Sequence, residues 1–121
     1  MNKRITGAVY EEKACAYLTG TGMKVLQRNY RNAAGEIDIV ARDGRSIVFV
    51  EVKFRRNHNA GYPVDAVDHH KRMQIIKVAR IYLYMNRIPD DTPVRFDVIG
   101  MSGEDIIYIR DAFDASGSVS G

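Results

Sequence analysis

Hydrophobic and polar residues follow two periodicities along the chain, and together they predict the order of helices and strands. Apolar residues spaced three and four positions apart predict helices over residues 5–19 and 68–86. Runs rich in Ile, Val, Phe and Tyr predict five strands, over residues 24–31, 36–42, 46–54, 93–100 and 105–110. The segment 55–67 is expected to be a loop because it contains glycine and proline. This order predicts a fold of the α/β class, with helices flanking a mixed central sheet.

The Asp43-Gly44 pair between two strand patterns predicts a β-hairpin with a two-residue turn. In that register Glu36 lies opposite Glu51, and Asp38 lies opposite Phe49. Because side chains alternate along a strand, we expect four charged residues on one face of the sheet: Glu36, Asp38, Glu51 and Lys53. The other face then carries the apolar core residues: Ile37, Ile39, Val48, Val50 and Val52.

The charged face would bring three carboxylates together, although like charges placed opposite each other destabilise a sheet. Carboxylates this close stay ionised only when a cation neutralises them, and oxygen ligands at this density suit Mg²⁺ or Mn²⁺. Lys53 is two residues from Glu51 on the same face, where it could hold an attacking water or stabilise a phosphoryl group. The pattern therefore predicts a metal site on rigid strands. The alternative is a solvated sheet face on which Glu and Lys alternate outward.

The first helix places one carboxylate on its apolar stripe. Ala8, Glu11, Cys15 and Leu18 share one side of that helix, whereas Glu12 points elsewhere. A buried carboxylate is costly unless it is paired or bound to a metal. Helical phase therefore favours Glu11 over Glu12 as a further site residue. The alternative is a glutamate at the edge of the stripe that pairs with a nearby arginine.

Length, charge and cysteine content set broader limits. A chain of 121 residues suffices for one domain, expected over residues 1–114, with a flexible tail over residues 115–121. No run approaches the roughly 20 apolar residues of a membrane helix, and no signal-peptide pattern is present at the start. The lone Cys15 excludes an intrachain disulfide and favours a cytoplasmic location. The net charge of +3 permits a nucleic-acid partner.

Basic residues are grouped near the predicted site in sequence. The candidates for phosphate contacts are Arg31, Arg55, Arg56, Lys71 and Arg72. Such contacts give affinity for nucleic acid without sequence preference, and the alternative is ordinary solvated charge. Tyr30 and Tyr62 are candidate stacking surfaces, although single tyrosines more often pack in a core. Asp97 is expected to orient Arg95 or another neighbour.

An Asp followed on the next strand by Glu-x-Lys resembles the PD-(D/E)xK nuclease superfamily, whose restriction-endonuclease-like core has the order α-β-β-β-α-β. The whole chain resembles more closely the YraN-like family of small bacterial proteins, described as similar to archaeal Holliday-junction resolvases. The match covers roughly residues 5 to 113. Its pieces are Gly7 with Glu11 and Ala14, 29-NYR-31, 35-GEIDIV-40, 49-FVEVKFR-55, Lys71 and 95-RFDVI-99. One departure from the superfamily is Ile37, which stands where a proline often precedes the aspartate.

The resemblance implies a metal-dependent nuclease with Mg²⁺ or Mn²⁺ as cofactor. Asp38 and Glu51 would be the metal-binding carboxylates, Lys53 the catalytic lysine, and Glu11 the helix carboxylate that completes the site. Glu36 would lie beside the ligands or serve as an alternate ligand. The implied substrate is DNA, including branched DNA, and a twofold homodimer would match the symmetry of a four-way junction. The alternative is a nucleic-acid-binding accessory module that keeps the nuclease fold with little or no activity.

Overall fold

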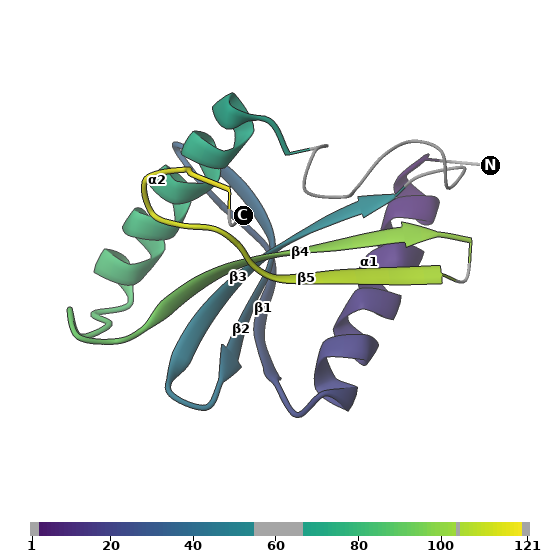
Figure 1. The fold of residues 1–121 in the computed structure, drawn as a ribbon, viewed down its shortest axis with the longest axis horizontal. Coiled ribbons are helices and arrows are strands. Elements are labelled where there is room, and N and C mark those ends of the chain that lie inside the picture. The colour runs from purple at the N-terminus through teal and green to yellow at the C-terminus, as the bar shows by residue number, and fades with distance from the viewer. Residues whose placement is uncertain (1–2, 55–66, 104, 120–121) are drawn as a thin grey trace.

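In the computed structural model, residues 3–54, 67–103 and 105–119 are described. The predicted loop over residues 55–67 lies outside the described part except for Val67, and so do Arg55, Arg56 and Tyr62. The elements follow the predicted order (Figure 1): α1 (Lys3–Gly20), β1 (Lys24–Asn32), β2 (Gly35–Asp43), β3 (Ser46–Phe54), α2 (His69–Met85), β4 (Val94–Ser102) and β5 (Asp105–Phe113). All seven predicted elements are confirmed, with ends that differ by a few residues at most.

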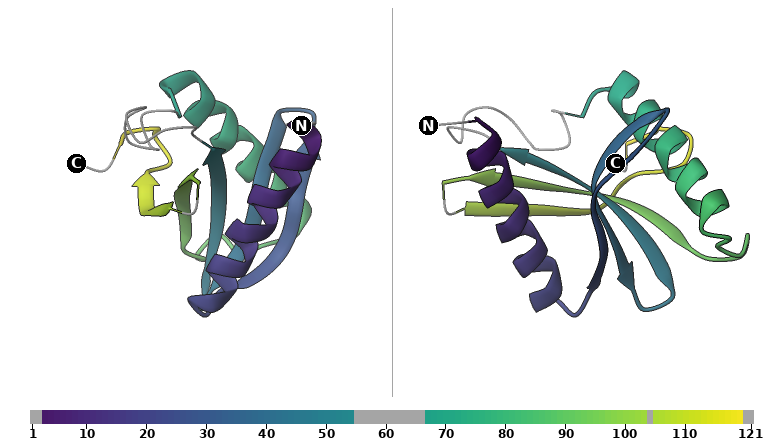
Figure 2. Two further views of the ribbon diagram at one scale, coloured as in Figure 1. Left: turned by 90° about the vertical axis from the view of Figure 1, so that its right-hand side faces the viewer. Right: turned by 180° about the vertical axis from the view of Figure 1, so that it is seen from behind.

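The five strands form one mixed sheet in the order β1-β2-β3-β4-β5. β3 and β4 are parallel, and the other neighbouring strands are antiparallel. A parallel pair needs a crossover connection, and α2 lies in that connection. α1 covers one face of the twisted sheet and α2 covers the other (Figures 1 and 2). This is the α/β arrangement, a mixed central sheet flanked by helices, that the sequence led us to expect. In the described part of the chain, no helix is long and apolar enough to cross a membrane.

Both helices have local signals at their ends. α1 ends where Gly22 adopts a φ of 98°, which is unfavourable for residues with a side chain. The N–H of Met23 then donates to the carbonyl of Leu18 at 3.1 Å. α2 begins at the N-cap Asp68, whose Oδ1 accepts a hydrogen bond from the N–H of Lys71 at 2.8 Å. This cap fixes the start of α2.

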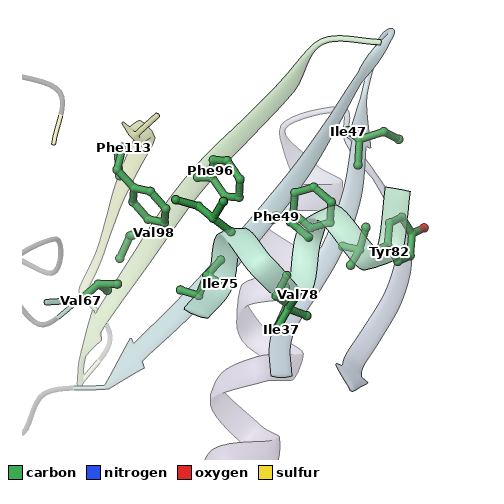
Figure 3. Close-up of a cluster of buried hydrophobic side chains, with 14 residues drawn as sticks. Ile37, Ile47, Phe49, Val67, Ile75, Val78, Tyr82, Phe96, Val98 and Phe113 are labelled. Atoms are coloured by element: carbon green, nitrogen blue, oxygen red, sulfur yellow. The ribbon is translucent and has the colours of Figure 1, made fainter. Parts of the chain in front are cut away.

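Each face of the sheet has its own apolar core. The core under α2 contains a row of aromatic rings, with Phe49–Phe96 centroids 5.7 Å apart and Phe96–Phe113 centroids 5.0 Å apart (Figure 3). The core under α1 packs Ala14 and Leu18 against β2, β3 and β4. Fully burying one large apolar side chain stabilises a fold by about 1.5–3 kcal/mol. The alternative prediction of a solvated sheet face is therefore wrong, because both faces carry buried side chains.

The predicted hairpin register is wrong by two residues. Asp43 pairs with Ser46, and Val40 pairs with Phe49 instead of Ile47. The turn therefore consists of Gly44 and Arg45, with a positive φ of 59° at Gly44 and not at Arg45, the pattern of a type II′ turn. A shift of two residues keeps each side chain on its face. However, Asp38 no longer lies opposite Phe49.

The predicted alternation in β2 is also wrong at one point. Ile37 packs in the core under α2, beside Val78 in Figure 3, whereas Ile39 packs in the core under α1. Residues two apart on a regular strand would share a face. The alternation therefore breaks at Asp38. The irregularity lies beside Asn29 of β1, whose φ is 51°. The direction of the Asp38 side chain therefore does not follow from regular strand alternation.

Candidate active site

Asp38 lies where two neighbouring strands separate. The pairing of β2 with β3 ends at Ile39 and Val50, and Figure 1 shows the start of β2 and the end of β3 running apart. Beyond that point, Oδ2 of Asp38 accepts a hydrogen bond from the N–H of Val52 at 2.8 Å. The Asp38 carboxylate thus accepts a hydrogen bond from a β3 N–H that no longer pairs with the main chain of β2. This bond fixes the carboxylate between the two strands.

Glu51 is the neighbouring carboxylate on β3, and it is 6% exposed. It lies on the α2 side of the sheet, because it is two residues from Phe49, which packs there. Its Oε1 lies 3.5 Å from Nζ of Lys53 and 3.9 Å from Nζ of Lys71. Both lysine side chains remain about a third exposed. Two lysines from different elements therefore share one oxygen of a buried carboxylate.

The site makes both carboxylates hard to ionise. Burial, together with the charges of Glu11 and Glu36, raises the pKa of Asp38 to about 6, although the hydrogen bond from the Val52 N–H and the charge of Lys53 lower it. Burial, together with the charge of Asp38, raises the pKa of Glu51 to about 7, although the charges of Lys71 and Lys53 lower it. The two carboxylates therefore repel each other in a poorly solvated place, which favours a proton or a cation between them.

The structure separates the two glutamates of α1. Oε2 of Glu12 lies 2.8 Å from Nη1 of Arg28, and the Glu12 side chain is 72% exposed. Glu11 is half-buried, and its charge raises the pKa of Asp38. The arginine pairing foreseen as an alternative thus describes Glu12. Helical phase brings Glu11 toward the carboxylate site, and its role there stays a prediction.

The remaining predicted residues lie around this centre or outside the described part. Glu36 pairs with Arg31 at 3.2 Å and acts on Asp38 through its charge. Arg72 donates from Nε to the carbonyl of Gly117 at 2.8 Å, and from Nη1 to the carbonyl of Val67 at 2.6 Å. The Arg72 guanidinium therefore donates to main-chain carbonyls, and one of them, that of Gly117, belongs to the segment 115–121 that was predicted as a tail.

The contact between Lys71 and Glu51 was not predicted, although Lys71 was a candidate for phosphate binding. A signal existed in the sequence. The helix that follows a strand in a parallel crossover begins at the carboxyl end of that strand, where sites of α/β proteins gather. The first turn of α2 therefore comes back to the end of β3, and Lys71 with it.

The donor set fits a hard divalent cation held by few protein ligands. Asp38 and Glu51 supply oxygen atoms, and a cation would relieve their mutual repulsion. Among the residues that the structure describes, no group of three Asp, Glu, His or Cys side chains is arranged to hold an ion alone. Mg²⁺ is commonly held by one or two carboxylates, with water and phosphate oxygens completing its shell. Asp38 and Glu51 match that mode of binding.

A second buried carboxylate cluster shows what a structural acid looks like in this protein. Asp97 receives Nε and Nη2 of Arg95, both at 3.0 Å, and also the N–H of Asp111 at 2.9 Å and the hydroxyl of Tyr108. Arg95 in turn donates to Asp43 at 2.9 Å. The Asp97 carboxylate is thus surrounded by donors, and it orients Arg95 as expected. Glu51 has longer contacts to two partly exposed lysines.

Residues 10–101 match the model of the uncharacterised protein family UPF0102. The chain belongs to this family. The resemblance to the YraN-like family is thereby confirmed. A UPF0102 protein from Lachnoclostridium phytofermentans is 48% identical over 118 residues, which is 98% of this chain and 100% of the relative. One from Persephonella marina is 43% identical over 91% of this chain and 94% of the relative.

All the site residues named above, from Glu11 to Lys71, lie in the segment that matches family UPF0102. A solved structure, Pyrococcus furiosus SfsA in complex with Ca²⁺, is also similar, with a TM-score of 0.41 and 16% identity. The similarity covers 90% of this chain and 64% of that chain.

Proposed function

We propose that this member of family UPF0102 is a metal-dependent nuclease that hydrolyses phosphodiester bonds in DNA, including branched DNA. Two carboxylates carry the proposal: the half-buried Asp38 and the buried Glu51 both have a raised pKa, chiefly through burial, and they lie beside two partly exposed lysines. A carboxylate with a purely structural role would be surrounded by hydrogen-bond donors, as Asp97 is. Perturbed carboxylates next to cations that face solvent are typical of a functional site.

In this proposal Asp38 and Glu51 would hold Mg²⁺ or Mn²⁺, with Glu11 alongside. When bound, the cation would stabilise charge on the phosphoryl oxygens and make a coordinated water more acidic. Lys53, freed from Glu51 by the cation, would hold the attacking water or a non-bridging oxygen of the phosphate. Lys71 would bind the same phosphate from α2. The hydrogen bond from Val52 to Asp38 keeps the carboxylate oriented before substrate arrives.

The test is cleavage of end-labelled duplex, single-stranded and four-way-junction DNA with Mg²⁺ or Mn²⁺ and with EDTA. We expect metal-dependent cutting by the wild type. Asp38→Asn and Lys53→Met should each reduce the rate by about a hundredfold or more, since each removes one charge from the reacting centre. Glu12→Gln should cut like the wild type, because Glu12 is an exposed partner of Arg28.

Failure to cut any of the three DNA forms with either metal would contradict the nuclease proposal. Salt-dependent binding of DNA by such an inactive protein would favour the accessory module in its place. Equal loss of activity in Glu12→Gln and Asp38→Asn would place the chemistry elsewhere on the protein.

A further inference from the structure

A stacked pair of aromatic rings lies on the α1 side of the sheet, at the end of β3. Tyr10 precedes Glu11 on α1, and Phe54 follows Lys53 at the end of β3. Their ring centroids are 4.1 Å apart with an interplanar angle of 23°. Tyr10 is half-buried against the core under α1, whereas Phe54 keeps 40% of its surface exposed. Part of this stacked aromatic surface is therefore open to solvent on the α1 side of the sheet, the side from which Glu11 acts on Asp38.

This pair differs from the aromatic contacts that serve packing. Phe49, Phe96 and Phe113 also lie together, but each is at most 4% exposed. Tyr30, a predicted stacking surface, packs edge-on against Tyr82 with centroids 5.1 Å apart. The Tyr10–Phe54 pair instead combines a stacked aromatic surface with partial exposure, as base-stacking surfaces do.

Positive charge accompanies the pair. Nζ of Lys13 lies 5.6 Å from the centroid of the Tyr10 ring, within the range of a cation–π contact. Lys53 precedes Phe54 in β3, with its side chain on the other, α2 side of the strand. Aromatic surfaces flanked by cations are how proteins bind single-stranded nucleic acid, with bases on the rings and phosphates on the charges.

We propose that Tyr10 and Phe54 form a stacking platform for an unpaired nucleobase beside the scissile phosphate. The platform rests on the proposed nuclease function and adds its substrate class. In an intact duplex the faces of each base are covered by its neighbours, and only a base outside the stack can cover Phe54. The substrate class is therefore DNA with an unpaired nucleotide at the cut, such as a flap, a single strand or a branch point.

The test uses 2-aminopurine, a fluorescent adenine analogue whose emission falls when it stacks on an aromatic ring. It is placed at an unpaired position of one end-labelled DNA and at a paired position of a duplex. Affinity and quenching are measured in Ca²⁺, and cleavage is measured in Mn²⁺ on separate samples. We expect the wild type to quench the unpaired probe and to bind that DNA more tightly than the duplex.

Phe54→Leu keeps an apolar side chain and removes the ring. It should abolish the quenching and weaken binding of unpaired DNA by about tenfold, with duplex binding unchanged. Phe54→Tyr keeps the ring and should behave like the wild type. Tyr84→Leu is the matched control, because Tyr84 is 82% exposed on the last turn of α2, away from the site. Melting curves check that each variant is folded.

The platform and the nuclease can fail separately. Cleavage in Mn²⁺ with equal quenching and affinity in wild type and Phe54→Leu would overturn the platform and leave the nuclease standing. Quenching that Phe54→Leu removes, in a protein that cuts nothing, would support the platform and overturn the nuclease. Absence of DNA binding in the wild type would overturn both.

Discussion

Glu51→Gln should stabilise the fold at alkaline pH, although it removes a charged partner of two lysines. In the unfolded chain the carboxyl of Glu51 loses its proton near its ordinary pKa of 4.5, whereas in the folded protein burial and Asp38 raise that pKa to about 7. Between these values the folded protein binds more protons than the unfolded chain does. The free energy of unfolding therefore falls as the pH rises through this window, and the loss is complete above the folded pKa.

The magnitude follows from the two pKa values. One pKa unit corresponds to about 1.36 kcal/mol, so moving from 4.5 to about 7 costs about 3 kcal/mol once Glu51 is ionised. Glutamine keeps the shape without the charge, and Lys53 and Lys71 are exposed enough to turn to water. We therefore expect Glu51→Gln to gain about 2 kcal/mol at about pH 8, which is about 8 °C in Tm for a chain of this length.

The assay is urea unfolding of wild type and Glu51→Gln in EDTA at several pH values from about 4 to about 8. The difference between the two should be near zero at the acid end and should grow through the window set by the folded pKa. Glu12→Gln is the control and should stay within about 0.5 kcal/mol throughout. Equal stability of wild type and Glu51→Gln at the alkaline end would show that ionised Glu51 does not destabilise the fold, and so would a difference that shrinks as the pH rises.

Three further changes probe the frame around the site. Asp97→Asn should cost about 3 kcal/mol in urea unfolding, because it breaks the buried pair with Arg95; a loss below about 1 kcal/mol would contradict this. Gly35→Ala should lower Tm, since Gly35 has a φ of 144° and a Cβ there would lie 2.8 Å from Nε2 of Gln74; unchanged Tm would contradict it. Asp68→Ala should cost about 1 kcal/mol through loss of the α2 cap, measured by urea unfolding, and unchanged stability would contradict that role.

The order of helices and strands could be predicted from the sequence because the spacing of apolar residues reflects which side chains are buried. It also placed Glu11 correctly relative to Glu12, since helical phase is fixed by 3.6 residues per turn. The hairpin was expected because few residues tolerate the backbone of a tight turn. However, the sequence around Gly44 allows glycine at either the first or the second central position of the turn. In the structure Gly44 occupies the first, as in a type II′ turn.

The geometry around Asp38 could not be predicted from strand alternation. Alternation assumes an unbroken ladder, and here the Asp38 side chain accepts the N–H of Val52 where the ladder with β2 has ended. Side chains of aspartate compete with main-chain acceptors in this way, and whether they succeed depends on the whole fold. The same holds for the contact of Lys71 with Glu51, which joins α2 to β3 across a long separation in sequence.

The proposed chemistry requires that Asp38 and Glu51 together hold a divalent cation. The most direct measurement is calorimetric titration of Mn²⁺ into wild type, Asp38→Asn and Glu12→Gln at about pH 8, where both site carboxylates are ionised in the wild type. It is carried out with and without single-stranded DNA. We predict saturable binding in wild type and Glu12→Gln, strengthened by DNA phosphate and lost in Asp38→Asn. Identical heats in wild type and Asp38→Asn under both conditions would contradict the claim.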